Sequence, residues 1–320
     1  MVRWGIIGLG KIAERFSASL SHSETGRLAA VASRQEEKRA AYLSRYPGLT
    51  AYDSYETLFR DPDIDAVYIA VPHSMHKELC LQALRAKKAV LCEKPVSLSE
   101  TESREITACA RENHVFFMEA MKTRFIPAIG EIKAALASGA IGEVKSLHAA
   151  FCSKLTDADL MTPGRYAGDP AEGGALLDAG PYPIAFALDL LGEDYVEQES
   201  RLTKWDNGLI AHAAIRLRYP GGALAELEAG FDRHDPRTAV ITGTEGTMEI
   251  PIWNRPCEFR LTNAAGTRIC RSELPVDDLF GEIEAANESI RKGVLEHPNY
   301  TWENMLAVMR VIDSAHGSSL

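Results

Sequence analysis

The chain has 320 residues, of which 46% are hydrophobic and 25% are charged, with a formal net charge of −10. These proportions are typical of a globular protein and exclude a disordered chain, a collagen or a simple coiled coil. At about 150 residues per domain, the length predicts two domains. An acidic chain without a basic stretch predicts no nucleic-acid partner. No apolar run approaches the ~20 residues that span a bilayer, so we expect no membrane partner.

Cysteine usage and the first residues bear on the cellular compartment. Residues 1–8 lack the layout of a signal peptide and lead directly into a strand-like run. The six cysteines form no Cys-x-x-Cys pair and have no histidine at zinc-finger spacing: Cys80, Cys92, Cys109, Cys152, Cys257 and Cys270. We therefore expect a cytoplasmic protein with buried, reduced thiols and no metal site; disulfides or a metal site are the alternatives.

Strand-like apolar runs alternate with helix-like segments over the first 120 residues. The expected strands are 2–8, 28–33, 65–71, 89–92 and 115–118. The expected helices are 11–21, 36–45, 76–86 and 99–113, with a short helix capped by Asp53 among them. This alternation predicts a parallel sheet with helices on both faces.

The pattern changes near residue 120, where we place the boundary between domains 1–120 and 121–320. Helices are expected at 125–138, 175–191, 279–293 and 300–316. A strand is expected at 143–152. Further strands are expected at 196–204, 209–219, 223–231, 238–242, 247–252, 257–262 and 267–272, and these predict an antiparallel meander. With few helices to cover it, one face of this sheet should be apolar and exposed, and we expect a homodimer to bury it.

A glycine motif follows the first expected strand and opens the first expected helix. Gly8-Leu9-Gly10-Lys11-Ile12-Ala13 has the form G-x-G-x-x-A. Gly8 permits the tight turn, Gly10 lets the backbone approach a pyrophosphate, and Ala13 permits close helix–sheet packing. Because strand, motif and helix occur in the required order, the motif predicts dinucleotide binding rather than a structural turn.

The end of the second strand distinguishes NADP from NAD. NAD-binding proteins place Asp or Glu there to hold the ribose 2′-hydroxyl. This chain has Ser33 and Arg34 instead, with Lys38 one helical turn later. Arg34 can pair with a 2′-phosphate and Ser33 can donate a hydrogen bond to it, so NADP is favoured. A solvent-exposed arginine without a ligand is the alternative.

Four segments occur in order along the chain: Gly8 to Ala13, Val71-Pro72-His73-Ser74-Met75-His76, Cys92-Glu93-Lys94-Pro95, and Gly173-Gly174-Ala175-Leu176-Leu177-Asp178-Ala179-Gly180-Pro181-Tyr182. Together they resemble the Gfo/Idh/MocA family of glucose-fructose oxidoreductases, inositol dehydrogenases and rhizopine-catabolism proteins. Tyr182 and the segment 118–125 resemble the branch that holds dihydrodiol dehydrogenases and NADP-dependent D-xylose dehydrogenases. Close relatives in that branch often have Trp where Lys122 stands.

The resemblance implies an α/β architecture, with an N-terminal Rossmann domain and a C-terminal α+β domain that contains a large, mostly antiparallel sheet. One face of that sheet covers the nicotinamide, and the other often makes a dimer interface. The implied activity is NADP-dependent hydride transfer with a secondary alcohol of a sugar, polyol or cyclic trans-dihydrodiol. Together with the residues above, the predicted cofactor site comprises Gly8, Gly10, Lys11, Ile12, Ser33, Arg34, Lys38, Val71, Pro72, His73, His76, Glu93, Lys94, Lys122, Arg124 and Arg165.

Three of these side chains have a second interpretation. His76 could be a packed helix histidine rather than a cofactor contact. Arg124 and Arg165 could face cofactor or substrate, or could form solvated ion pairs.

Lys94, Asp178 and Tyr182 are the predicted catalytic residues. Pro181 should kink or restart the helix, which would place Tyr182 in its first turn, where the positive helix end favours a phenolate. A nearby Lys94 cation would lower the pKa of Tyr182 and so suit it to act as acid/base. Asp178 would orient the substrate hydroxyl. The reverse assignment, with Lys94 as acid/base, stays open.

Two other functions compete with a freely exchanging dehydrogenase. The first is a non-catalytic, dinucleotide-sensing regulator of the same fold, which the intact Lys94, Asp178 and Tyr182 argue against. The second is an oxidoreductase that cycles a tightly bound cofactor between two sugars.

Overall fold

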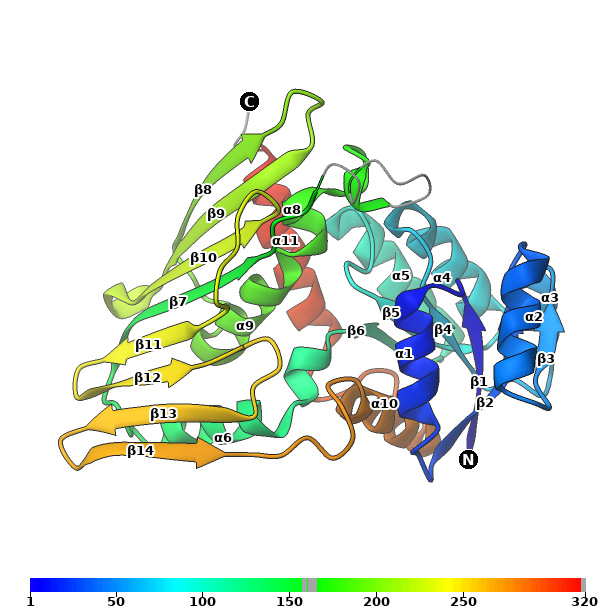
Figure 1. The fold of residues 1–320 in the computed structure, drawn as a ribbon, viewed down its shortest axis with the longest axis horizontal. Coiled ribbons are helices and arrows are strands. Elements are labelled where there is room, and N and C mark those ends of the chain that lie inside the picture. Colours follow the sequence, from blue (N-terminus) through cyan, green and yellow to red (C-terminus); the bar gives the residue numbers. More distant parts are fainter. Residues whose placement is uncertain (157–159, 161–165, 318–320) are drawn as a thin grey trace. The chain divides into compact units, whose positions relative to one another are not determined.

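The computed structural model describes residues 1–156, 160 and 166–317. Contacts divide the chain into two compact units. The first unit consists of Met1–Lys122 together with Pro275–Trp302, and the second consists of Thr123–Leu274 and Glu303–Leu320. Each unit has its own sheet (Figure 1).

The first unit is built on a six-stranded parallel sheet of order β3-β2-β1-β4-β5-β6. Its strands are β1 (Val2–Ile7), β2 (Gly26–Ala32), β3 (Thr50–Tyr52), β4 (Ala66–Ile69), β5 (Ala89–Glu93) and β6 (Phe117–Ala120). Its α-helices are α1 (Lys11–Leu20), α2 (Glu36–Arg45), α3 (Tyr55–Arg60), α4 (His76–Arg85), α5 (Glu100–Asn113) and α10 (Phe280–Lys292). The strand order reverses between β1 and β4, the position at which doubly wound sheets bind ligands. The predicted Rossmann architecture is confirmed.

The core of this unit is organised around the fully buried Trp4. The Phe16 ring stacks on Tyr68 with ring centroids 3.8 Å apart, and it meets Trp4 edge-on at 5.6 Å. The indole nitrogen of Trp4 donates a 2.7 Å hydrogen bond to Asn287 Oδ1 on α10. A late segment of the chain is therefore built into the first sheet's core.

The N-terminal caps of α5 and α3 are both serine residues. Ser99 Oγ accepts a hydrogen bond from the Glu102 amide at the start of α5, which is one of the two contacts of a capping box. The Asp53 prediction is wrong by one residue, because Ser54 occupies the N-cap position of α3.

The second unit is built on an eight-stranded sheet of order β14-β13-β12-β11-β7-β10-β9-β8. Its strands are β7 (Val144–Cys152), β8 (Glu197–Lys204), β9 (Ile210–Arg218), β10 (Leu224–Gly230), β11 (Ala239–Gly243), β12 (Gly246–Ile250), β13 (Glu258–Asn263) and β14 (Gly266–Arg271). Its α-helices include α6 (Pro127–Ala137), α8 (Gly174–Asp178), α9 (Pro181–Leu191) and α11 (Trp302–Gly317). Short 3₁₀ segments occur in both units. They are η1 (His73–Met75), η2 (Lys122–Phe125), η3 (Tyr166–Gly168) and η4 (Pro220–Gly222).

One pairing in this sheet departs from the expected antiparallel meander. β7, which precedes the other seven strands in the chain, lies between β10 and β11 and runs parallel to β10. The first strand thus occupies the middle of the sheet. Helices α6, α8 and α9 pack on one face, against β13, β9, β10 and β7 (Figure 1).

The other face of this sheet is charged, so the expectation of an exposed apolar face is wrong. The strand register places one row of side chains across neighbouring strands: Ile269, Arg260, Glu249, Val240, His148, Glu226, Arg216 and Glu199. Within this row Arg216 contacts Glu226 at 3.0 Å and Arg260 contacts Glu249 at 3.3 Å. Charged side chains replace the apolar surface that the small number of covering helices suggested.

The cysteine and membrane predictions can be compared with the described residues. All six cysteines are free, and Cys80, Cys92, Cys109 and Cys152 are buried. Cys257 is exposed, so the expectation of burial is wrong for that residue. Among the described residues, no helix is long and apolar enough to span a membrane.

Candidate functional site

The glycine motif forms the turn between β1 and α1. Gly8 has φ +84°, and a Cβ atom there would lie 2.2 Å from the carbonyl oxygen of Ala70, after β4. Only glycine fits this close approach. Gly10 occupies the N-cap position of α1, and a Cβ atom there would meet nothing within 4 Å. The second glycine thus leaves open space beside the helix N-terminus, which suits an anionic pyrophosphate. The adjacent Lys11 is exposed and Ile12 is half-buried.

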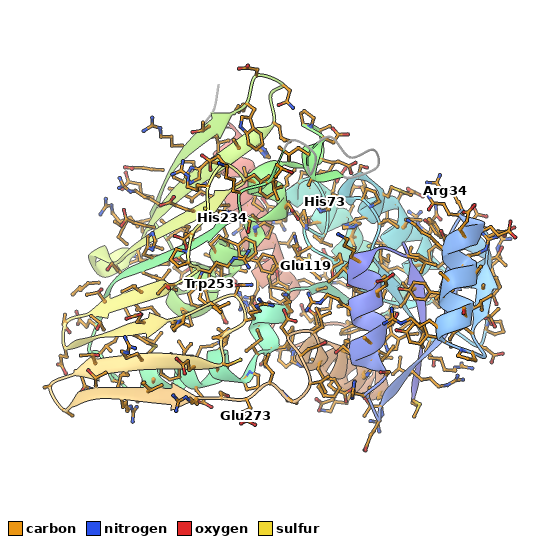
Figure 2. The ribbon with its side chains drawn as sticks, in the orientation of Figure 1. Arg34, His73, Glu119, His234, Trp253 and Glu273 are labelled. Carbon is orange, nitrogen blue, oxygen red and sulfur yellow. The ribbon has the colours of Figure 1, made fainter. Side chains whose placement is uncertain are left out.

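The residues that would select NADP lie just after β2. The Ser33 side chain is buried, and its hydroxyl accepts a 3.2 Å hydrogen bond from the Gln35 amide. Arg34 and Lys38 are both exposed (Figure 2 labels Arg34). Arg39 donates a 2.6 Å hydrogen bond to the Ser33 carbonyl and so fixes the backbone between β2 and α2. Sequence reasoning missed Arg39, which positions the loop without belonging to the motif.

The loop after β4 contains the two histidines of the Val71–His76 motif. The His76 ring is fully buried, with Nδ1 2.8 Å from the Pro95 carbonyl and Nε2 2.9 Å from the Val71 carbonyl. Both of its ring nitrogens therefore contact backbone, and it connects the loop after β4 to the loop after β5. The structure thus gives His76 the geometry of a packed histidine. His73 is also buried, with its ring centroid 5.6 Å from that of His76. Val71 is buried and Pro72 half-buried.

Glu93 and Lys94 lie at the carboxyl end of β5, at the edge where doubly wound sheets bind ligands. Burial raises the pKa of the Glu93 carboxyl. The Tyr68 hydroxyl donates a hydrogen bond to this carboxyl, which acts to lower the pKa, but the effect of burial is larger. Lys94 is 8% exposed, and its peptide bond to Pro95 is cis. This edge therefore presents the nearly buried Lys94 directly after the half-buried Glu93.

Glu119, on the neighbouring β6, is a buried carboxyl that is not among the predicted site residues (Figure 2). Burial raises its pKa to about 7, although the Tyr300 hydroxyl and the Val96 amide both donate hydrogen bonds to it. Its signal in the sequence is weak, because a Glu in an apolar run also fits a strand end.

Lys122 forms a buried ion pair with Asp278, which also contacts Arg15. Burial opposes the charge of Asp278, yet Lys122 and Arg15 hold the pKa of its carboxyl below the usual value. Glu282, on α10, is also buried. Burial and the charge of Glu93 raise the pKa of its carboxyl. The predicted cofactor residue Lys122 thus belongs to a charge network whose members lie far apart in the chain.

Asp178 and Tyr182 belong to the second unit, where a break separates two helices. α8 ends at Asp178 and α9 begins at Pro181, so the predicted restart of the helix at Pro181 is confirmed. Tyr182 is the second residue of α9, in the first turn. Both side chains are half-buried. Tyr182 therefore lies in the first turn of α9, the position in which a positive helix end would favour a phenolate.

The Tyr182 ring packs against Phe151, with ring centroids 5.1 Å apart and an angle of 28° between the rings. The guanidinium carbon of Arg237 lies 4.4 Å from the centroid of the same Phe151 ring, and Nη2 donates a 2.5 Å hydrogen bond to Ser153 Oγ. Burial and the neighbouring Arg255 lower the pKa of Arg237, while the carboxylate of Asp235 acts in the opposite direction. Arg237 is thus a cation beside the predicted acid/base, and sequence reasoning missed it.

The two remaining predicted arginines have different outcomes. Arg124 forms an ion pair with Asp189 at 2.7 Å, and both side chains are almost fully buried. The solvated ion pair considered for Arg124 is therefore wrong, because the pair is shielded from water. Lys133 contacts the same carboxylate at 2.5 Å. Arg165 lies outside the described residues.

Comparison with known proteins places the chain in a family. Residues 2–121 match the model of an oxidoreductase family with an NAD-binding Rossmann fold, GFO_IDH_MocA. Residues 129–249 match the GFO/IDH/MocA C-terminal domain. The chain belongs to the Gfo/Idh/MocA oxidoreductase family, as its four motifs predicted.

Individual relatives match most of the chain. Trans-1,2-dihydrobenzene-1,2-diol dehydrogenase of Mus musculus is 32% identical over 312 residues, which cover 93% of this chain and 90% of that protein. The protein of the same name from Bos taurus is 34% identical over 314 residues, with the same coverage. A 3-ketoreductase from Actinomadura kijaniata, solved in complex with NADP and TDP-benzene, has a TM-score of 0.88 at 27% identity, covering 99% of this chain and 97% of that one.

Proposed function

We propose that this protein is an NADP-dependent dehydrogenase that acts on a secondary alcohol of a sugar, a polyol or a cyclic trans-dihydrodiol. The observation that carries the proposal is the arrangement at the carboxyl edge of the first sheet. The glycine turn, the exposed Arg34 and the nearly buried Lys94 all follow strands of that sheet. Similarity to dihydrodiol dehydrogenases and to an NADP-bound ketoreductase supports this assignment.

The described residues fit a dinucleotide. The open space beside Gly10 and the N-terminus of α1 would hold the pyrophosphate, and Ser33 and Arg34 would hold a 2′-phosphate. Lys38 would add positive charge from the next turn. When bound, the cofactor supplies the group that accepts or donates hydride. The remaining predicted contacts stay predictions: Lys11, Ile12, Val71, Pro72, His73, His76, Glu93, Lys122, Arg124 and Arg165.

The chain's own residues would manage the proton. Alcohol oxidation requires loss of the hydroxyl proton, and an unperturbed tyrosine, with a pKa near 10, is a poor base at neutral pH. We assign the acid/base role to Tyr182, in the first turn of α9. Lys94 would donate a hydrogen bond to the reacting oxygen, and Asp178 would orient the substrate. Lys94 as acid/base is the competing assignment.

The test combines a substrate screen with two variants. Purified protein is assayed with NADP against aldoses, inositols and dihydrodiols. If Tyr182 is the acid/base, Tyr182→Phe should lower the chemical rate by about 10²–10⁴-fold and leave the cofactor affinity unchanged. Lys94→Ala should be at least as damaging, and the double variant little worse, because groups that act as a unit are not additive. Normal turnover in Tyr182→Phe, with an inactive Lys94→Ala, assigns the proton to Lys94.

The same assays separate the competing functions. Activity in both variants would contradict the catalytic proposal and favour a dinucleotide-sensing regulator. Absorbance of reduced nicotinamide that survives desalting would favour an enzyme that keeps its cofactor and cycles between two sugars.

We also propose a cytoplasmic homodimer. The open face of the eight-stranded sheet, which carries the charged row, would form the interface with the same face of a second copy. Light scattering at micromolar concentration is the test, and a 35.1 kDa particle alone would contradict the dimer.

A further inference from the structure

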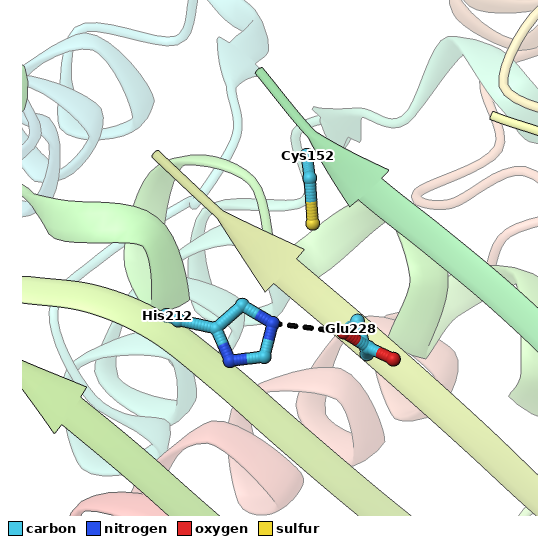
Figure 3. Close-up of side chains that lie close together, drawn as sticks. All are labelled: Cys152, His212 and Glu228. Carbon is cyan, nitrogen blue, oxygen red and sulfur yellow. Dashed lines mark hydrogen bonds and ion pairs between the residues drawn. The ribbon is translucent and has the colours of Figure 1, made fainter. Parts of the chain in front are cut away.

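We propose that the second unit binds a zinc-like divalent cation between Cys152, His212 and Glu228 (Figure 3). The three residues come from the adjacent strands β7, β9 and β10. Their ligand atoms, one sulfur, one imidazole nitrogen and one carboxylate oxygen, all lie within 4.8 Å of one another. Nothing in the proposed dehydrogenase reaction uses these side chains.

The strand register explains why three distant residues converge. Gly230 on β10 is the partner of Cys152 on β7 and also of His212 on β9. Glu228 lies two residues before Gly230, and therefore on the same face of the sheet. The three donors thus surround a position that has no side chain of its own.

Gly230 keeps the centre of this cluster free. A Cβ atom at Gly230 would lie 2.9 Å from Cys152 Sγ, 2.9 Å from His212 Cδ2 and 3.0 Å from Asp232 Oδ1. The Asp232 carboxylate also lies beside this position, but both of its oxygens accept hydrogen bonds from Arg233, so it is not counted among the ligands. Any larger residue would occupy the space into which these groups point.

The donor set is the one that zinc prefers. Zinc takes thiolate, imidazole and carboxylate ligands in tetrahedral sites, with bond lengths of about 2.0–2.3 Å. His212 Nε2 already contacts Glu228 Oε2 at 2.9 Å, so these two donors are held at a spacing that small movements would open around an ion. Without a metal, that hydrogen bond leaves Cys152 outside the pair. A cation accounts for all three side chains together.

The experiment measures metal binding by the full-length protein after treatment with a chelator. Zinc is titrated by calorimetry, and cobalt is added separately because a cobalt–thiolate bond gives a charge-transfer absorption. We expect about one equivalent of either metal and a thiolate band. Cys152→Ala should abolish the band and weaken zinc binding by about 100-fold or more, since loss of even an outer-shell partner costs 10–100-fold. The matched control is Cys257→Ala, which removes an exposed thiol and should change neither result.

Two further variants keep the test independent of folding at the buried cysteine. Glu228→Gln alters a half-exposed side chain and should weaken zinc binding at least tenfold. Gly230→Ala retains every donor but fills the centre, and it should also weaken binding. Circular dichroism shows whether each variant is folded. Absence of binding to the parent protein, or equal binding by the folded Cys152→Ala or Glu228→Gln variants, would overturn the proposal and leave a hydrogen-bonded His212–Glu228 pair.

Discussion

Replacing Arg34 with Ala should change the preference between the two nicotinamide cofactors. Arg34 is exposed and forms no ion pair among the described residues, so its removal leaves no buried partner unsatisfied. A hydrogen bond to a charged group contributes about 1.5–3 kcal/mol, and exposure to solvent favours the lower end. A loss of about 1.5–2 kcal/mol corresponds to a dissociation constant for NADP that is roughly 10- to 30-fold higher. The dissociation constant for NAD, which has no 2′-phosphate, should not change.

Calorimetric titration of the parent protein and of Arg34→Ala with each cofactor measures this difference directly. Lys38→Ala is the matched control, because it removes an exposed cation one helical turn away and should weaken NADP binding less. Ser33 and Arg39 are left intact, so the backbone between β2 and α2 keeps its hydrogen bonds. The reasoning is refuted if both cofactors lose affinity equally, or if the parent protein binds NAD more tightly than NADP.

Three further predictions concern stability. Gly8→Ala should lose dinucleotide binding and lower the melting temperature, since its Cβ atom would lie 2.2 Å from a carbonyl oxygen. The control is Gly48→Ala, which has a similar φ but open space around it, and it should lower the free energy of unfolding by only about 1–2 kcal/mol. Glu119, with its pKa raised to about 7, binds its proton more tightly in the folded state, so its contribution to stability is full below about pH 4 and falls as the pH rises through 7. Urea unfolding measures the free energy of unfolding. Between pH 5 and pH 8 this free energy should decline by about 2 kcal/mol less in Glu119→Gln than in the parent protein, and an equal decline in both would contradict the assignment. Asn287→Ala should cost about 1–3 kcal/mol in the same assay by orphaning the Trp4 indole N–H, and adding Trp4→Phe should cost less than the sum of the single changes.

Local requirements made much of the first unit predictable from sequence. The glycine turn depends on the backbone conformation of Gly8 and the space around Gly10, which neighbouring residues determine. In the second unit, the helix restart at Pro181 was predictable for the same reason, since it depends on the proline itself. β3 was missed, because three residues are too few to show a period.

Long-range pairing could not be predicted in the same way. The strand pattern of residues 143–152 indicates a strand, yet nothing in it specifies that β7 pairs in parallel with β10. Side-chain contacts between residues far apart in the chain could not be predicted for the same reason. The ion pair of Lys122 with Asp278 joins residues far apart in the chain, as does the contact of Arg237 with Phe151.

The return of residues 275–302 to the first unit has a consequence for biosynthesis. When the ribosome has completed residue 274, the six parallel strands exist, but Trp4 lacks the Asn287 acceptor and Glu119 lacks the Tyr300 donor. The nucleotide-binding unit therefore cannot reach its final form during the first part of translation, and the second unit has its whole sheet before the first unit is complete. A fragment cut after residue 122 would leave the Trp4 indole N–H and the Glu119 carboxyl without these partners. A free-standing version of the first unit needs residues 1–122 spliced to residues 275–302.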